Sequence, residues 1–323
     1  MGLGDNVLQP FFLKEEFVLS QKPFETPPYL LEKCKQRPAV KTAIAGADHP
    51  VALESTRQAV HHGLIDPVLV GDKAIINSVA KGLGWDISNY RIIHAPGDDK
   101  APAAAVALAR SNEVIALMKG QVHTDALMGA VIDRNLGLRT GRRLSHIFHM
   151  TIPEHDRVLM ITDGAVNVVP NTDTLIHITQ NAVDLAHALG NSNPKVALLS
   201  GTESIIKSIP SSINANEVVK RANNGEITGA TIDGPFAFDN AISPDAAKLK
   251  GVDSPVAGYA DILVVPNIET GNGLFKMMVY FMSATAAGIV MGAKVPIMLT
   301  SRADPAEARV ASAALAAIVA NKT

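Results

Sequence analysis

Residues 260–303, ADILVVPNIETGNGLFKMMVYFMSATAAGIVMGAKVPIMLTSRA, contain the pattern that decides the fold. An apolar strand at 262–265 leads into a Gly- and Asn-rich turn at 269–273. The apolar run 277–293 predicts a long helix inside the protein, because it is shorter than the roughly 20 residues that cross a bilayer. A second strand is expected at 296–300. Strand, helix and strand in this order are typical of a mostly parallel α/β sheet.

Polar side chains follow both of these strands. Thr270, Asn272 and Lys276 belong to the turn and to the expected first turn of the helix, and Ser301 and Arg302 follow the second strand. Free N–H groups at a helix start attract anions, and ligands of parallel α/β sheets bind beyond the carboxyl ends of the strands. We therefore expect one cleft with an anion site. Each feature also fits a local role, as a helix cap or a surface loop.

The composition is that of a globular protein, with 47% hydrophobic and 19% charged residues in a chain of 323. The net charge is −2 and the isoelectric point about 6.6, so no overall basic field attracts nucleic acid or an anionic membrane. A single cysteine, Cys34, excludes an internal disulfide and a cysteine-rich zinc site. With no secretory signal at the start of the chain, we expect a cytoplasmic protein.

Short strands and helices alternate from about residue 40 to a final helix at 304–320. This alternation predicts a mostly parallel sheet that helices cover on both faces. The common nucleotide, hydrolase and zinc motifs are absent, including GxGxxG after the first strand, GxxxxGK[ST], GxSxG and HExxH. His146 and His149 lie three apart in an expected strand, hence on opposite faces, so we expect no metal site there.

A basic loop follows a helix that is expected to start at Thr124. Arg139, Arg142 and Arg143 lie within a stretch of five residues, in a segment that also contains Gly137 and Gly141. A solvated charge run and an anion-binding loop explain this pattern equally well.

Several long motifs resemble one enzyme family, phosphate acetyltransferase/phosphate butyryltransferase. They are TDGAVNVVPN (162–171), DGPFAFDNAIS (233–243), SPVAGYADILVVPNIETGN (254–272) and TSRAD (300–304). They occur in the family's order, and the resemblance extends over nearly everything from about residue 40 onward. The segment TSRADPAEAR looks like the butyryltransferase branch.

The resemblance implies two three-layer α/β domains with mostly parallel sheets and a cleft between them, as in the isocitrate/isopropylmalate dehydrogenase-like fold. Residues 1–38 would be an N-terminal leader, 39–148 plus 297–323 the first domain, and 149–296 the second. The implied reaction is acyl-CoA + phosphate = acyl phosphate + CoA, with acetyl or butyryl as the acyl group. Coenzyme A and phosphate would be substrates rather than bound cofactors, and the family is commonly homodimeric.

The resemblance also implies roles for individual residues. Ser301 and Arg302 would be catalytic, Thr270, Asn272 and Lys276 would complete the phosphate pocket, and Arg139 and Arg142 would meet phosphate or CoA. In the acetyl-specific branch an aspartate seven residues beyond the serine serves as the base, but here that position is Ala308. Glu307 and Asp304 are the possible substitutes. Asp304 also fits as the N-cap of the last helix, with Pro305 at N1 and Glu307 at N3.

Two other functions remain open from the sequence. One is an NAD(P)-dependent decarboxylating dehydrogenase of the same fold, which would need a set of aspartates around a divalent metal. The other is an acyl-CoA-binding module without turnover, for which Ala308 is the hint.

Overall fold

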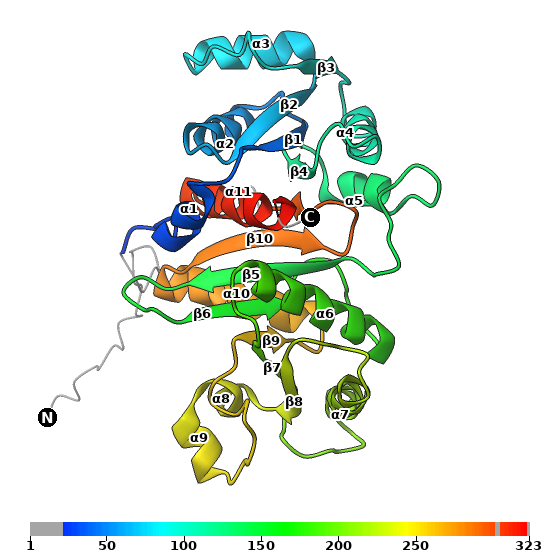
Figure 1. The fold of residues 1–323 in the computed structure, drawn as a ribbon, viewed down its shortest axis with the longest axis vertical. Coiled ribbons are helices and arrows are strands. Elements are labelled where there is room, and N and C mark those ends of the chain that lie inside the picture. Colours follow the sequence, from blue (N-terminus) through cyan, green and yellow to red (C-terminus); the bar gives the residue numbers. More distant parts are fainter. Residues whose placement is uncertain (1–21, 301–303, 322–323) are drawn as a thin grey trace, which may run out of the picture.

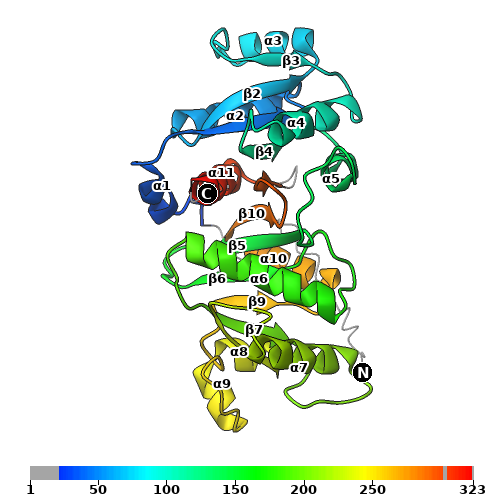
Figure 2. The ribbon, with the colours of Figure 1, turned by 45° about the vertical axis from the view of Figure 1, so that its right-hand side comes forward.

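The computed structural model describes residues 22–300 and 304–321. Its centre is an 11-stranded sheet with the order β3-β2-β1-β4-β11-β10-β5-β6-β9-β7-β8. The sheet runs along the length of the molecule, with α3 at one end and α9 near the other (Figures 1 and 2). An α/β fold with a large, mostly parallel sheet is therefore confirmed. The division into domains at residues 38, 148 and 296 stays a prediction, because the sheet is continuous across it.

The first part of the chain forms the upper half of Figure 1. Its elements are α1 (Pro28–Cys34), β1 (Val40–Ala45), α2 (Pro50–His61), β2 (Ile65–Gly71), α3 (Lys73–Gly82), β3 (Ile92–His94), α4 (Lys100–Arg110), β4 (Ala116–Lys119) and α5 (Thr124–Ile132). The chain later returns to this half with β11 (Ile297–Met298) and α11 (Ala306–Ala320).

The remaining elements form the central strands and the lower half. They are β5 (Ser145–Thr151), β6 (Val158–Thr162), α6 (Thr172–Ala188), β7 (Lys195–Leu199), α7 (Pro210–Asn223), β8 (Thr231–Phe236), α8 (Phe238–Ile242), α9 (Pro244–Leu249), β9 (Ile262–Val264), α10 (Ile268–Met282) and β10 (Thr285–Met291). β6 and β7 belong to the alternation of short strands and helices that the sequence predicts from about residue 40. The short helix α8 was not predicted.

Apolar side chains fill both faces of the sheet. In β1, Ile44 belongs to the core shared by α2, α6 and α11, whereas Ala43 and Ala45 belong to the core under α4 and α5. A third cluster lies under α10, around Phe148 and Phe275. Successive strand residues point to opposite faces, so the apolar runs of these strands make a helix–sheet–helix sandwich.

The middle of the sheet is antiparallel. β10 pairs antiparallel with both β11 and β5, and β5 pairs antiparallel with β6. β4 and β11 are parallel to each other, as are β6 and β9. Counting the reversals, β9 runs opposite to β11. Their carboxyl ends therefore point in opposite directions, so a shared sheet edge does not bring them together, and one cleft for both stays a prediction.

The apolar run 277–293 is not one helix, which corrects the prediction. α10 ends at Met282, Ser283 takes a left-handed conformation with φ 51°, and β10 begins at Thr285. β10 lies between β11 and β5 and is buried along nearly its whole length. A strand that is buried on both faces has no alternation of polar residues, so its periodicity does not distinguish it from a buried helix.

Two helix starts also differ from the prediction. Asn267 caps α10 by accepting from Thr270 N at 2.9 Å, so residues 269–273 are helical, and Lys276 lies in the third turn rather than the first. In α11 the N-cap is Pro305 and no side chain caps the helix. The expected capping box of Asp304 and Glu307 is therefore wrong, because α11 begins one residue later than that pattern requires.

The described part of the leader packs on the C-terminal helix. Arg37 Nη1 donates to the Ile318 carbonyl at 2.9 Å, and Cys34 Sγ lies 3.6 Å from the Ala314 carbonyl oxygen. α1 and α11 therefore hold each other, although 280 residues separate Cys34 from Ala314 in sequence.

Candidate active site

A small polar cavity lies where β4 and β11 end. Its volume is about 30 Å³, and its lining combines the start of α2, the residues after β4 and the segment around α11, namely Val51, Ala52, Ser55, Met118, Lys119, Gly120, Gln121, Thr300 and Arg309. Ser301 and Arg302, the expected catalytic pair, lie outside the described residues. Thr300, just before them, lines the cavity, and Asp304, just after them, is followed by the start of α11.

The end of β11 is held by a buried histidine. β11 has only two residues in the ladder, and beyond it His146 Nε2 lies 3.1 Å from the Leu299 carbonyl oxygen. A carbonyl oxygen only accepts, so Nε2 carries the proton of the neutral ring. Burial lowers the pKa of His146, with the Asp163 carboxylate acting in the opposite direction. The neutral imidazole is thus a fixed donor to the strand that precedes Ser301.

Glycine 288 leaves the room for this contact. A Cβ at Gly288 would lie 2.6 Å from the Leu299 oxygen and 2.9 Å from His146 Nε2. The Gly288 N–H donates to Ser312 Oγ of α11 at 2.9 Å. β10, β5 and α11 therefore meet tightly at one point next to the strand end.

The start of α11 carries the expected substitute bases. Ala308 is buried, whereas Asp304 and Glu307 are half-buried. The Arg309 guanidinium donates to the Asp304 carbonyl oxygen, and its Nε is buried with no hydrogen-bond partner among the described residues. A guanidinium is thus fixed at the cavity wall in the turn that follows Arg302.

A much larger cavity, of about 620 Å³, lies between α5, α6 and the basic loop. Arg139, Arg142 and Arg143 all line it, together with Thr124 and Asp125 at the start of α5. The remaining polar wall comes from Asn167, in the turn after β6, and from His177 of α6. The sequence had pointed to Arg139 and Arg142, and it had missed Asn167 and His177. Asn167 lies inside a quoted family motif, which was the available signal, whereas His177 carried none.

The turn after β6 is built around a buried carboxylate. Asp163 is 1% exposed and accepts from the N–H groups of Ala165, Val166 and Asn167 at 2.9–3.2 Å. It also accepts from Asn167 Nδ2 at 2.7 Å, while the same amide donates to the Leu144 carbonyl at 2.8 Å. Asn167 is therefore held rigidly between the turn and the end of the basic loop.

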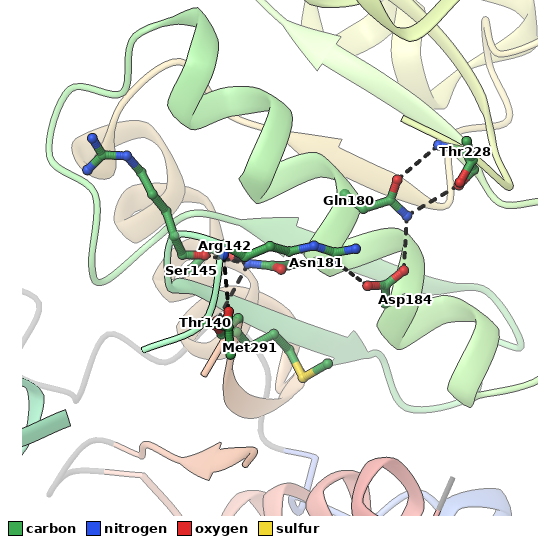
Figure 3. A network of polar contacts seen from close by, with 10 residues as sticks. Thr140, Arg142, Ser145, Gln180, Asn181, Asp184, Thr228 and Met291 are labelled. Atoms are coloured by element: carbon green, nitrogen blue, oxygen red, sulfur yellow. Dashed lines mark hydrogen bonds and ion pairs between the residues drawn. The ribbon is translucent and has the colours of Figure 1, made fainter. Parts of the chain in front are cut away.

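The side chains of α6 support the basic loop from behind (Figure 3). Arg142 pairs with Asp184, which accepts from Gln180 Nε2 at 2.9 Å. Gln180 in turn accepts from Thr228 N at 2.9 Å and lies 3.3 Å from its carbonyl oxygen. A relay of polar contacts thus fixes one arginine of the cavity.

A buried amide holds the next arginine of the loop. Asn181, which is 2% exposed, donates to the Arg143 carbonyl at 3.0 Å and to Ser145 Oγ at 2.8 Å. Thr140 Oγ1 donates to the Gly292 carbonyl at 2.7 Å and accepts from Arg142 N at 3.1 Å. The loop is therefore anchored at several points while Arg139, Arg142 and Arg143 remain exposed, and its role in anion binding stays a prediction.

The start of α10 lines neither cavity, although it contacts the turn after β6. Thr270 Oγ1 donates to Asn267 Oδ1 at 2.7 Å, and Asn272 Nδ2 lies 3.5 Å from the Gly164 carbonyl oxygen. Lys276 is exposed on the third turn. Thr270, Asn272 and Lys276 line neither cavity. Through Gly164 this helix start supports the turn that carries Asn167, whereas its assignment to the phosphate pocket stays a prediction.

Comparison with known proteins now decides the family. Residues 98–317, more than half of the chain, match the family described as "Phosphate acetyl/butaryl transferase". The chain belongs to this family. The phosphate acetyltransferase of Rickettsia prowazekii (strain Madrid E) is 44% identical over 326 residues, which cover 99% of this chain and 91% of the relative. The protein is therefore a phosphate acyltransferase by family, and the matched residues include both walls of the arginine cavity.

Solved structures agree with this assignment. A branched-chain phosphotransacylase from Enterococcus faecalis V583 has a TM-score of 0.76 and 31% identity, covering 87% of this chain and 99% of that one. The 4-hydroxythreonine-4-phosphate dehydrogenase of Klebsiella pneumoniae shares the fold alone, with a TM-score of 0.53 and 12% identity over 87% of this chain and 99% of that chain. The phosphate acyltransferase family thus has a dehydrogenase-like fold here, as the sequence predicted.

Neither a metal cluster nor a membrane helix is found in the described part of the chain. Residues 22–300 and 304–321 contain no group of three or more His, Cys, Asp or Glu side chains placed to hold a metal ion. No helix in the same ranges has both the length and the apolar character to cross a bilayer.

Proposed function

We propose that this protein transfers an acyl group between coenzyme A and inorganic phosphate: acyl-CoA + phosphate = acyl phosphate + CoA. The observation that carries the proposal is the 620 Å³ cavity with three arginines on one anchored loop, inside the segment that matches the family. Both substrates are anions, and arginine binds phosphate groups through paired, charge-assisted hydrogen bonds.

The chemistry requires a held anion and a stabilised oxyanion. A phosphate oxygen attacks the thioester carbonyl carbon, the tetrahedral intermediate collapses, and the C–S bond breaks. The proton of the attacking phosphate ends on the CoA sulfur, so the equation balances without a further reactant. Positioning and preorganised donors supply the rate for such a step. In this proposal Ser301 donates to the oxyanion or to the sulfur, and Arg302 binds phosphate.

The remaining site residues take supporting roles in the proposal. Arg139, Arg142 and Arg143 meet the phosphates of CoA, which is a substrate and not a resident cofactor. Thr270, Asn272 and Lys276 were expected at the phosphate pocket, but their contacts in α10 favour a structural role for the first two. Either Glu307 or Asp304 serves as the base, or no base is needed because a thiol with a pKa of about 8.5 is already partly ionised near neutrality.

The acyl group is acetyl or a slightly longer group such as butyryl. The relative from Rickettsia prowazekii carries the name phosphate acetyltransferase, and the solved relative from Enterococcus faecalis is a branched-chain phosphotransacylase. The assay measures phosphate-dependent release of CoA thiol from acetyl-CoA, butyryl-CoA and a branched acyl-CoA. Release with none of the three would overturn the proposed function, and the ratio of kcat/KM values assigns the acyl group.

The proposal includes a homodimer in the cytoplasm. The outer side of α10 exposes Met277, Tyr280 and Phe281 at 40%, 52% and 40%, an apolar strip that a second copy can cover. Light scattering on the purified protein and on Tyr280→Glu tests this state: the wild type is expected as a dimer and the variant as a monomer. A wild-type monomer at micromolar concentration would contradict it. The single cysteine and the CoA substrate are consistent with the cytoplasm.

A further inference from the structure

A third cavity, which shares no lining residue with the two described above, lies at the far edge of the sheet. Its volume is about 430 Å³, and it lies between α3, the edge strand β3 and the loop that connects them. In Figure 1 this region forms the upper end of the molecule. Three strand spacings separate β3 from β4, which is about 14 Å at the usual distance between strands. The family match begins at residue 98, after this region.

One wall of the cavity is aromatic and preformed. Trp85 and Tyr90 line it with their ring centroids 5.5 Å apart and the ring planes tilted by 50°, and both side chains also pack against the hydrophobic core. The loop is fixed by its own backbone, because Trp85 N donates to the Ala80 carbonyl and Tyr90 N to the Ile87 carbonyl, both at 3.0 Å. Both side chains are half-buried. A flat aromatic ligand therefore meets rings that are already in place.

The opposite wall is cationic. Lys73, Asn77 and Lys81 line the cavity from α3 at a spacing of four residues, which puts all three on one face of the helix. Neither lysine has an ion-pair partner among residues 22–300 and 304–321. The acidic side chain in the lining is Asp86, which accepts from Ser88 N at 2.9 Å, and this bond holds its pKa low. The two lysines and Asp86 together give the lining a net charge of +1.

We propose that this cavity binds a nucleoside phosphate. Its base stacks against Trp85 and Tyr90, and its phosphates lie along Lys73 and Lys81. Stacking on aromatic rings tolerates any base, whereas the lysines demand an anion. The volume is within the range of small-ligand sites. Free nucleotides and the adenosine phosphate part of CoA share this chemistry, so either one is a source of the ligand.

The experiment uses the fact that Trp85 is the single tryptophan of the chain. The intact protein is titrated with ADP and with CoA, and the fluorescence is excited where adenine does not absorb. We expect a saturable change with both compounds and at least tenfold weaker binding of adenosine and of inorganic phosphate, each of which offers half of the interaction. Tighter binding of CoA than of ADP assigns the site to the substrate, and the reverse assigns it to free nucleotides.

A lysine double variant tests the cationic wall. Lys73→Gln/Lys81→Gln is expected to raise the dissociation constant of ADP at least tenfold. The matched control, Lys207→Gln/Lys220→Gln, also removes two exposed lysines but leaves the constant unchanged, and both proteins keep acyltransferase turnover within about twofold. No saturable change with either nucleotide, or an equal constant in the two double variants, would overturn the proposal. If the wild type released no CoA thiol from any acyl-CoA, that result would contradict the proposed acyltransferase function and would leave the nucleotide site unaffected.

Discussion

The cavity at Thr300 and the cavity at the basic loop differ in size and in the way their walls are held. The first has about 30 Å³, the room of one water molecule, and its walls are strand ends fixed by buried contacts such as His146 to Leu299. The second has about 620 Å³ and presents exposed arginines on a loop that α6 supports. A small fixed site suits reacting atoms, whereas a large cationic one suits a bulky anionic substrate. Changes at the first should therefore alter kcat, and changes at the second KM.

The largest effect is expected for Ser301→Ala. Loss of one donor to a developing oxyanion costs about 10²–10³ in kcat, while the Michaelis constants stay nearly unchanged. Steady-state kinetics of thiol release measure both values. Ser254→Ala, far from both cavities in sequence, is the control and should keep full activity. An equally active Ser301→Ala protein would show that Ser301 is not catalytic. The small cavity at Thr300 would then no longer be assigned to the reacting atoms.

A smaller loss is expected for His146→Met. Removing the donor to the Leu299 carbonyl releases the end of β11, so kcat should fall about tenfold. A buried acceptor without a hydrogen bond costs about 1–3 kcal/mol, and a tenfold loss lies at the lower end of this range. His149→Met is the matched control, because His149 is equally buried in β5 but contacts Tyr29 instead of β11. His146→Gln keeps an N–H donor and should recover most of kcat. Equal kcat losses in the two methionine variants would show a general stability effect.

The same histidines predict a loss of stability in acid. Burial lowers the pKa of His149 to about 4 and also lowers that of His146, from an ordinary value of 6.5. Below pH 6.5 the unfolded chain binds protons that the folded protein does not, so stability is complete above pH 6.5 and falls toward pH 4. For His149 the loss is about 3 kcal/mol. Urea unfolding at pH 7.5 and pH 4.5 measures it, and His149→Gln should show a weaker pH dependence than the wild type.

A change in KM rather than in kcat is expected for the large cavity. Arg143→Gln should raise the KM for acyl-CoA about tenfold with kcat within about twofold, since a charge-assisted hydrogen bond contributes about 1.5 kcal/mol or more. Arg134→Gln, just before the loop and outside the lining, is the control. A lowered kcat with an unchanged KM would place Arg143 with the reacting atoms, and the distinction between the two cavities would then fail.

The sequence predicted most elements and the family, but not the antiparallel centre of the sheet. The run 277–293 contains the end of α10 and all of β10, and both are apolar because both are buried. Nothing in such a run marks where a helix changes to a strand. β10 is antiparallel to both of its neighbours, so β11 and β5 run the same way, and the antiparallel pair of β5 and β6 then reverses the direction of β9 relative to β11.

The site shows the same division. The motifs at 162–171 and 300–304 and the arginines of the basic loop could be found in the sequence, because their residue types and order are local properties. His146, Asn167 and His177 could not be assigned, because their roles depend on contacts between segments far apart in the chain, such as His146 with Leu299 over 153 residues.

The sequence by itself determined the composition of each layer, the alternation of helix and strand and the family, since periodicity and motifs are written in neighbouring residues. Only the tertiary structure decided which strand ends share an edge, which arginines line one cavity and which histidine supports β11. Strand direction and burial are set by long-range packing, and no local pattern contains that information.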